Sequence, residues 1–523
     1  SADVRVLFGQ PTLMALAAAV GSGSEIQVPD NGIQPGCTRI TPSMLPLVEL
    51  DQQTIDRIVD TVPGGAANVQ DIYPLAPLQE GIFFHHLSAE QGDLYVLQSQ
   101  FAFDHRERLD AFVEALQVVI DRHDILRTSV VWEGLESPVQ VVWREAKLHV
   151  EAVDLDPAAG DAVAQLQQRF DPRHHRLDVS QAPLMRLAYG QDAANHRLVA
   201  TLLFHHMALD HTALEVVQYE MQAHLMGDVG QLADAVPYRN YVAQARLGMS
   251  REEHEVFFRE MLGDVDEPTL PFGLQDVQGG GHGIEEAGQS VEASLDLRLR
   301  AQARQLGVSV ASLVHLAWAQ VLGKVSGKQD VVFGTVLMGR MQGGADTERA
   351  LGMFINTLPL RVQVGQQGVR AGVKAVHARL TSLLGHEHAS LALAQRCSGV
   401  AAPLPLFSAL LNYRHSATGS VSAQATDAWQ GIHALNGEER TNYPLTLNVD
   451  DLGNGFSLTV LVAAQIGAQR VCGYMHTALE KLVEALEQTP QAALYRLPIL
   501  PEAEREQLLV AFNATDAEYP LEQ

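Results

Sequence analysis

Residues 198–215 decide the fold of this chain, and they read LVATLLFHHMALDHTALE. The run 198–204 is apolar except at Thr201, which predicts a strand buried on both faces. Thr212, with Glu215 three residues later, matches a capping box and predicts a helix through about residue 225. A buried strand that leads directly into a helix is typical of α/β proteins.

Helix and strand patterns alternate on both sides of this segment. Before it, a helical period ends at Arg122 and a hairpin pattern covers residues 129–143. After a glycine-containing break at 273–288 the alternation resumes with a helix at 299–325, a strand at 330–339, a helix at 373–384, a strand at 407–412, a hairpin at 445–462 and a helix at 468–487. Because 523 residues exceed what one core usually organises, we expect an α/β fold in two similar lobes.

Composition argues against several classes of protein. The chain has 36 basic and 62 acidic residues, and its net charge of −26 repels phosphate backbones and anionic membrane surfaces. No apolar run approaches the length that spans a bilayer. Cys37, Cys397 and Cys472 are far apart, which disfavours a disulfide framework or a zinc site. We expect a cytoplasmic protein without nucleic-acid or membrane partners.

The turn after the buried strand carries the candidate chemistry, because α/β folds bind ligands at such strand ends. Adjacent strand residues face opposite sides, so one of His205 and His206 can face a cleft, and we expect it to be His206. A neutral imidazole suits a general base near pH 7, and Asp210 is a candidate to orient or anchor it. The alternative is that two buried histidines and an aspartate merely satisfy one another.

Other chemistries are disfavoured. The opposed directions of the two histidines and the missing His-x-x-x-His helical pair make a shared metal awkward, so no metal is expected. The chain has no Gly-x-Ser-x-Gly elbow, phosphate loop or dinucleotide fingerprint in a strand-to-helix context. These observations favour direct acyl transfer.

The segment from His205 to Asp210 resembles the His-His-x-x-x-Asp-Gly signature of the condensation domains of nonribosomal peptide synthetases. It departs from that signature at His211, where the family usually has glycine. Other segments resemble further motifs of the family in the same order: 73–81 (YPLAPLQEG), 122–128 (RHDILRT), 238–241 (YRNY), 334–340 and 352–357 (GMFINT). The resemblance covers almost the whole chain.

This resemblance implies two lobes, each like chloramphenicol acetyltransferase, that form a V-shaped pseudo-dimer with a central tunnel. It implies that two carrier domains insert phosphopantetheine arms from opposite faces and that this chain binds no cofactor directly. The catalytic candidates are then His206, His205 and Asp210. His206 contacts the acceptor amine and assists its attack on the donor thioester, while Asp210 pairs with Arg340 to support the motif.

A second motif, residues 85–93 (HHLSAEQGD), resembles the extended motif of dual epimerisation and condensation domains, which invert the donor α-carbon before condensing it. A thioester acidifies its α-proton, so an imidazole beside that carbon can remove it. The candidates to assist are His85, His86, His211 and Glu439. The alternative for each is a solvated or packed side chain.

The flanks resemble parts of a larger synthetase. Residues 7–13 resemble the end of a carrier domain, and 508–520 resemble the lead into an adenylation domain. The expected organisation is a carrier remnant at 1–20, a linker with a short helix at 21–70, an N-terminal lobe at 71–255, a C-terminal lobe at 256–498 and a linker toward an adenylation domain at 499–523. The expected partners are the upstream and downstream carrier domains and the adjacent adenylation domain.

Three alternatives stay open. A condensation-only domain would accept a preformed D-donor without making it. A catalytically silent docking module is a second alternative, against which the intact His206 and Asp210 argue. A stand-alone acyltransferase that uses coenzyme A is compatible with the fold, but the flanks disfavour it.

Overall fold

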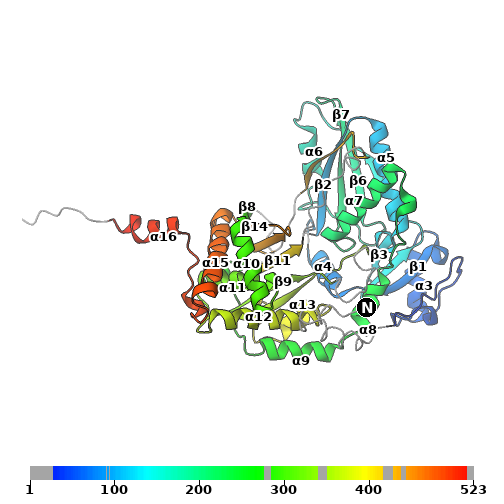
Figure 1. The fold of residues 1–523 in the computed structure, drawn as a ribbon. Helices are drawn as coiled ribbons and strands as arrows, with labels where there is room; N and C mark the ends of the chain where they lie inside the picture. The colour runs from blue at the N-terminus through cyan, green and yellow to red at the C-terminus, as the bar shows by residue number, and fades with distance from the viewer. Residues whose placement is uncertain are drawn as a thin grey trace, which may run out of the picture.

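The computed structural model describes residues 27–89, 91–93, 95–275, 284–339, 350–415, 428–437 and 443–514. Figure 1 shows two lobes set at an angle to each other, with a smaller unit beside them. The predicted α/β fold in two lobes is confirmed. The segment 1–20, which we expected to be a carrier remnant, lies outside the described residues.

The first lobe is built on a five-stranded sheet. In spatial order its strands are β12 (Ile432–Gly437), β2 (Val96–Phe103), β7 (Arg197–His205), β6 (Met185–Asp192) and β5 (His149–Ala152). Its helices are α4 (Pro77–Ser88), α5 (Arg106–Arg122), α6 (Ala162–Arg169) and α7 (His211–Met226). The strand β7 is central and is buried from Val199 to His205, which is why the sequence there is apolar.

The strand β12 belongs to the first lobe although it comes from the second half of the chain. It pairs antiparallel with β2, with Ile432 opposite Phe103. Both residues are buried in the same core cluster as Phe112. The N-terminal lobe is therefore not the contiguous stretch 71–255 that the sequence predicted, because residues 432–437 supply an edge strand of its sheet.

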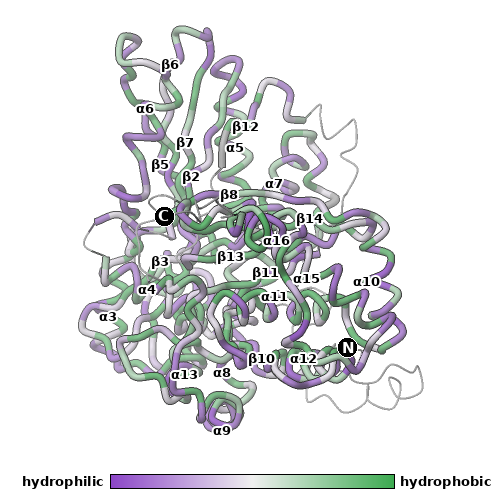
Figure 2. Tube along the Cα trace, turned by 90° about the vertical axis from the view of Figure 1, so that its left-hand side faces the viewer, coloured by the Kyte–Doolittle hydropathy of each residue, from purple (hydrophilic) through white to green (hydrophobic). Residues whose placement is uncertain are grey.

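The second lobe has a six-stranded sheet with helices packed on it. In spatial order the strands are β10 (Asn356–Gln363), β9 (Asp330–Leu337), β11 (Ala409–His415), β13 (Leu445–Asp451), β14 (Phe456–Ala463) and β8 (Ile284–Val291). The helices are α9 (Arg251–Leu262), α10 (Ala293–Leu306), α11 (Val310–Ser326), α12 (Val369–Leu384), α13 (Leu391–Arg396) and α15 (Ala468–Gln488). Figure 2 shows mainly hydrophobic residues along α11 and both hydrophilic and hydrophobic residues along α9. The helix α16 (Glu502–Leu509) projects away from this lobe in Figure 1.

The predicted lobe boundary at 255/256 falls inside α9. Phe258, Met261 and Leu262 of this helix are buried in the core of the second lobe. The Ser250 side chain caps the helix by accepting a hydrogen bond from the Glu253 N–H. The whole of α9 therefore belongs with the second lobe, which begins earlier than the sequence predicted.

The helix predicted at 299–325 is two helices, α10 and α11, bent by 109°. Gly307 has a left-handed φ of +66° and ends α10, and the Ser309 side chain accepts from the Ser312 N–H and starts α11. Within the described ranges, no single helix meets the length and hydropathy criteria for a membrane span. This bent pair meets them only when its two helices are taken together.

Replacing Ser309 with alanine is expected to lower the free energy of unfolding by about 1 kcal/mol, because α11 loses its N-cap. Ser309→Asp keeps a capping oxygen and is expected to stay within about 0.5 kcal/mol of the parent. Denaturant-induced unfolding, followed by circular dichroism, gives both values. Equal losses in the two variants would show that capping is not what the serine provides.

The smaller unit combines the segment before the first lobe with a hairpin. Its elements are α3 (Gln52–Thr61), β1 (Val69–Pro74), β3 (Thr128–Val131) and β4 (Val139–Trp143), with the strands in the order β1-β4-β3. Ile33, Ile40 and Leu45 are buried against Ile55 and Ile58 of α3. The stretch 21–70, expected to be a linker with a short helix, is thus a packed layer where the structure describes it. Short 3-10 helices lie at Pro42–Met44, Gly65–Asn68, Asp124–Arg127, Val229–Gln231, Pro271–Gly273, Leu494–Arg496 and Ala511–Asn513.

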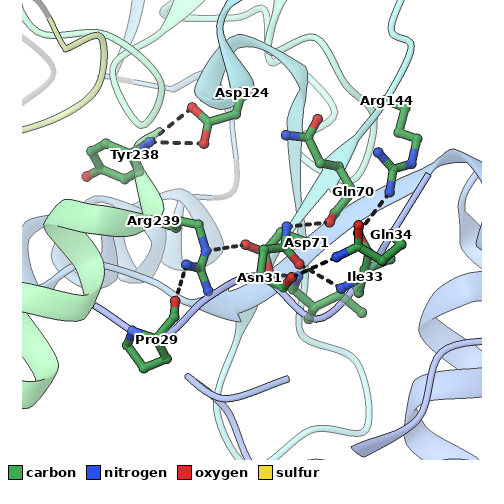
Figure 3. Close-up of polar contacts among 11 residues, drawn as sticks. Pro29, Asn31, Ile33, Gln34, Gln70, Asp71, Asp124, Arg144, Tyr238 and Arg239 are labelled. Carbon is green, nitrogen blue, oxygen red and sulfur yellow. Dashed lines mark hydrogen bonds and ion pairs between the residues drawn. The ribbon is translucent and has the colours of Figure 1, made fainter. Parts of the chain in front are cut away.

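Polar contacts fasten this layer to the helix α8 (Arg239–Leu247), as Figure 3 shows. The Nε of Arg239 donates to Asp71 at 2.7 Å, and its guanidinium also donates to the Pro29 carbonyl. The side-chain amide of Asn31 donates to the Gln70 carbonyl at 2.9 Å. A buried carboxylate needs such a partner, so Arg239 fixes the start of β1 relative to α8.

Candidate active site

The two candidate histidines lie where β7 ends beside β2. Val96 of β2 pairs with His205, and the His206 N–H donates to the Tyr95 carbonyl at 2.8 Å. The Ala208 N–H donates to the His205 carbonyl at 3.0 Å and closes a turn. His205 is fully buried, whereas His206 is partly buried. The two neighbours therefore lie in different surroundings.

The ring of His205 is held in one tautomer. Its Nδ1 accepts a hydrogen bond from the Met207 N–H at 3.1 Å, so the proton of the neutral ring is on Nε2. Nε2 lies 3.0 Å from Oδ2 of Asp93 and donates to it. Burial lowers the pKa of the His205 ring, which favours the neutral form that accepts from the Met207 N–H.

His206 has the opposite tautomer. Its Nδ1 lies 2.9 Å from the Leu209 carbonyl, which can only accept, so Nδ1 carries the proton. In the neutral ring Nε2 is then the nitrogen that can accept a proton. This is the protonation state that a general base requires.

Asp210 fixes the end of the turn to α7. Its Oδ1 accepts from the Ala213 N–H at 2.7 Å, which makes Asp210 the N-cap residue. The capping box predicted at Thr212 and Glu215 is therefore wrong. The helix begins at His211, because the buried Asp210 carboxylate already caps its first turn.

The other oxygen of Asp210 reaches a segment from the second half of the chain. Oδ2 accepts from the Phe354 N–H at 3.1 Å. The same segment is held by two tyrosines: the Tyr238 hydroxyl donates to the Met353 carbonyl at 2.6 Å, and the Tyr241 hydroxyl donates to the Phe354 carbonyl at 3.2 Å. The segments 205–210 and 352–357, which both resemble family motifs, therefore meet at Asp210.

Three predicted side chains cannot be placed. Arg340, the expected partner of Asp210, and Glu439 lie outside the described residues, and the side chain of His211 is not described. Their roles stay predictions.

The helix α4 brings a second pair of histidines to this region. His86 is buried, and its Nδ1 lies 2.5 Å from Oδ2 of Asp93, the oxygen that also accepts from His205. The rings of His86 and His205 are edge to face, with centroids 5.6 Å apart. His85 is half-buried and is not part of this cluster; its ring lies 5.9 Å from that of Tyr95, and burial lowers its pKa.

His86, Asp93 and His205 also form a set of side chains that could hold a metal ion, since their ligand atoms lie within 4.8 Å of one another. Two ligands of one tetrahedral zinc ion are about 3.3 Å apart, given bonds of about 2.0–2.1 Å. The 2.5 Å between His86 and Asp93 is shorter than this and matches a strong hydrogen bond. The hydrogen-bond network fits these distances better than shared metal coordination.

Asp93 and Tyr95 are residues that the sequence reasoning did not assign. Asp93 ends the motif 85–93, so a signal was present in the sequence. The position of Tyr95 beside His206 depends on the β2–β7 register, which the sequence does not reveal. Burial raises the pKa of the Tyr95 phenol and that of the Tyr443 phenol in the second half of the chain.

Comparison with known proteins shows the family of the chain. The family model of the condensation domain matches residues 69–509. The chain is 51% identical over 520 residues to malpinin synthetase of Mortierella alpina, covering 99% of this chain and 7% of that protein. It is 48% identical to malpibaldin synthetase of the same organism, covering 100% of this chain and 9% of that protein. It therefore spans less than a tenth of the length of these relatives.

The fold is also found among solved structures. The condensation domain of the monacolin K polyketide synthase MokA superposes with a TM-score of 0.60 at 17% identity, covering 82% of this chain and 100% of that one. At this identity the likeness shows the fold alone, whereas the family model covers most of the chain. The chain therefore belongs to the condensation-domain family of peptide synthetases, whose reaction is peptide-bond formation.

Proposed function

We propose that this chain is a dual epimerisation and condensation domain. It inverts the α-carbon of an L-aminoacyl or peptidyl thioester on the upstream carrier and then joins that donor to the amino acid on the downstream carrier. One observation carries the proposal: His205 of the condensation signature and His86 of the extended motif share the same oxygen of Asp93. The two motifs thus form one structural unit.

In peptide-bond formation the acceptor amine attacks the carbonyl carbon of the donor thioester. The C–N bond forms, the C–S bond breaks, the amine loses one proton, and the thiolate of the upstream arm gains one. His206 is suited to pass this proton, because the Leu209 carbonyl keeps Nδ1 protonated and leaves Nε2 as the base. Positioning of the two substrates contributes a large share of the rate.

In epimerisation the same imidazole removes the α-proton that the thioester acidifies, and a second group returns a proton to the opposite face. No proton is consumed overall. His85 and His86 are the candidates on α4 for the second group: the Nδ1 of His86 is bonded to Asp93, and burial lowers the pKa of His85, which disfavours the protonated ring that would return the proton. Glu439 and His211 stay candidates on the resemblance alone.

The proposed substrates arrive on phosphopantetheine arms, and the chain binds no cofactor of its own. Relatives more than ten times longer than this chain, named as synthetases, support carrier and adenylation domains as partners. The proposed organisation keeps residues 1–20 as a carrier remnant and 499–523 as the lead into an adenylation domain. A cytoplasmic location is supported by the free thiols of Cys37, Cys397 and Cys472.

The test loads an L-aminoacyl or L-peptidyl pantetheine on the upstream carrier and adds the aminoacylated downstream carrier in D₂O. The expected product is D-configured at the donor α-carbon and carries deuterium there, because the returned proton comes from solvent. Chiral chromatography and mass spectrometry read both properties.

Each other outcome would favour one of the alternative functions. Product formed only from a D-donor, without deuterium, would contradict epimerisation and leave a condensation-only domain. An L-configured product would do the same. No product from either donor would favour a silent docking module, and product from a coenzyme A thioester as donor would favour a stand-alone acyltransferase.

A further inference from the structure

The motif 85–93 ends in a backbone position that accepts only glycine. Gly92 has a φ of +67°, and a Cβ there would lie 2.1 Å from the Arg173 carbonyl oxygen. The Asp93 N–H donates to the Pro172 carbonyl at 2.7 Å. These two contacts fix the backbone position from which the Asp93 side chain extends.

The Asp93 carboxylate accepts hydrogen bonds at both oxygens. Oδ1 accepts from the Tyr95 N–H at 2.9 Å, and Oδ2 accepts from His86 at 2.5 Å and from His205 at 3.0 Å. Burial alone would raise the pKa of Asp93, but the hydrogen bonds from His205 and His86 outweigh it and hold the pKa well below its usual value. The carboxylate is therefore an anion at neutral pH.

The bonds continue from Asp93 to the catalytic turn. Because Nε2 of His205 donates to Asp93, Nδ1 of the same ring can accept from the Met207 N–H. Met207 follows His206 directly. The Tyr95 carbonyl, two residues after Asp93, accepts from the His206 N–H. Asp93, through His205, and the Tyr95 carbonyl thus hold the backbone on both sides of the His206 side chain.

We propose that Asp93 is a positioning residue for peptide-bond formation itself: it fixes the Nε2–H tautomer of His205 and so sets the turn that carries His206, with His86 holding Asp93 from the other side. The motif 85–93 then acts on the condensation signature rather than on the substrate. This inference concerns condensation and does not require epimerase activity.

Asparagine at position 93 cannot reproduce this pattern. With its carbonyl oxygen in place of Oδ2, its NH₂ group faces the Tyr95 N–H. With the amide turned over, NH₂ faces His205, whose ring must then protonate Nδ1 against the Met207 N–H. Either arrangement sets two donors against each other. Asp93→Asn therefore disturbs the turn while it preserves the volume of the side chain.

The experiment measures peptide formation from a preformed D-donor, so that epimerisation is not needed. Asp93→Asn is expected to lower kcat by about tenfold to a hundredfold, since small misplacements of a catalytic group have effects of this size. The KM for the downstream carrier is expected to stay nearly unchanged, because Asp93 is buried and offers no surface to a docking protein. Nitrogen NMR of labelled histidine, with the His205 signals assigned by their absence in His205→Gln, is expected to show a changed tautomer at His205.

Asp192→Asn is the matched control. This aspartate is also buried, lies at the end of β6, and accepts from Asn195 and Arg197 far along β7 from the histidines. Both variants are checked by thermal melting. A similar loss of kcat in Asp192→Asn would mean that general destabilisation explains the result and would overturn the proposal.

A second pair of variants covers the case in which Asp93→Asn does not fold. His86→Phe keeps a ring but removes the donor to Asp93, and His86→Gln supplies an amide donor in its place. The expected result is a loss of kcat in His86→Phe that His86→Gln partly restores.

Two results would refute the positioning role. Full D-donor condensation in a folded Asp93→Asn, with deuterium exchange on the L-donor lost, would show that the motif acts only in epimerisation. Unchanged condensation and unchanged exchange would show that the cluster is merely packed. If the parent chain accepts only L-donors, the proposed dual function fails, and the same variants are then compared with the L-donor.

Discussion

Replacing His206 with alanine is expected to lower kcat for peptide formation at least about 100-fold and to abolish deuterium incorporation at the donor α-carbon. In the proposed function both reactions need a base at this turn, and Nε2 of His206 is the ring nitrogen that can accept a proton when the Leu209 carbonyl binds the proton on Nδ1. The His206 side chain is partly buried, and the N-cap of α7 is Asp210 rather than His206. The variant is therefore expected to fold normally. Steady-state kinetics with a D-donor and exchange with an L-donor measure the two losses separately.

His105→Ala is the control for His206. This histidine is exposed and precedes α5, and its side chain makes no capping hydrogen bond. Its removal is expected to leave both reactions within about twofold of the parent, since surface substitutions have small effects. If His206→Ala lost only exchange and kept condensation, the acceptor amine would not need this imidazole, and positioning alone would account for peptide formation.

The sequence predicted the local structure of the candidate catalytic segment well because its signals are local. The apolar run 198–204 corresponds to β7, and the helix after it corresponds to α7. The start of that helix was misassigned, since Asp210 and Thr212 are both good N-caps and only the structure shows which side chain reaches the Ala213 N–H. The break between α10 and α11 was missed for a related reason: the apolar period continues across Gly307 and Ser309, which carry the stop and start signals.

Local sequence patterns do not reveal which distant strands pair with each other. The strand β12 is six residues long and joins a sheet more than 200 residues away in sequence, which no periodicity can reveal. The cluster of His86, Asp93 and His205 has the same origin. His86 and Asp93 belong to the motif 85–93 and His205 to the motif 205–210, but their contact depends on how α4 lies against the end of β7. What the sequence could not supply is therefore the geometry that links the motifs.

That geometry suggests how the site divides its tasks. Two carboxylates hold the turn between β7 and α7: Asp93 binds the buried ring of His205, and Asp210 caps α7 and reaches Phe354. His206 lies between these two anchors. Loss of Asp93 is expected to misplace the turn, whereas loss of Asp210 is expected to loosen the contact between the turn and the second half of the chain.

Asp210→Ala is accordingly expected to lower the free energy of unfolding by about 1.5–5 kcal/mol. The loss of the N-cap of α7 contributes about 0.5–2 kcal/mol, and the buried Phe354 N–H that loses this acceptor contributes about 1–3 kcal/mol. Asp210→Asn keeps a capping oxygen but sets its NH₂ group against the Phe354 N–H, so it is expected to fall between the parent and Asp210→Ala. Denaturant midpoints give the order of the three proteins.

Asp161→Ala supplies the control for Asp210. Asp161 caps α6 through the Ala164 N–H and is exposed, so its removal costs only the cap, about 1 kcal/mol. The excess loss in Asp210→Ala over Asp161→Ala then measures the link to Phe354. If Asp210 is structural, the variant at low temperature, where it is folded, keeps more peptide formation than His206→Ala. Unchanged stability with complete loss of activity would instead place Asp210 among the groups that contact the substrate.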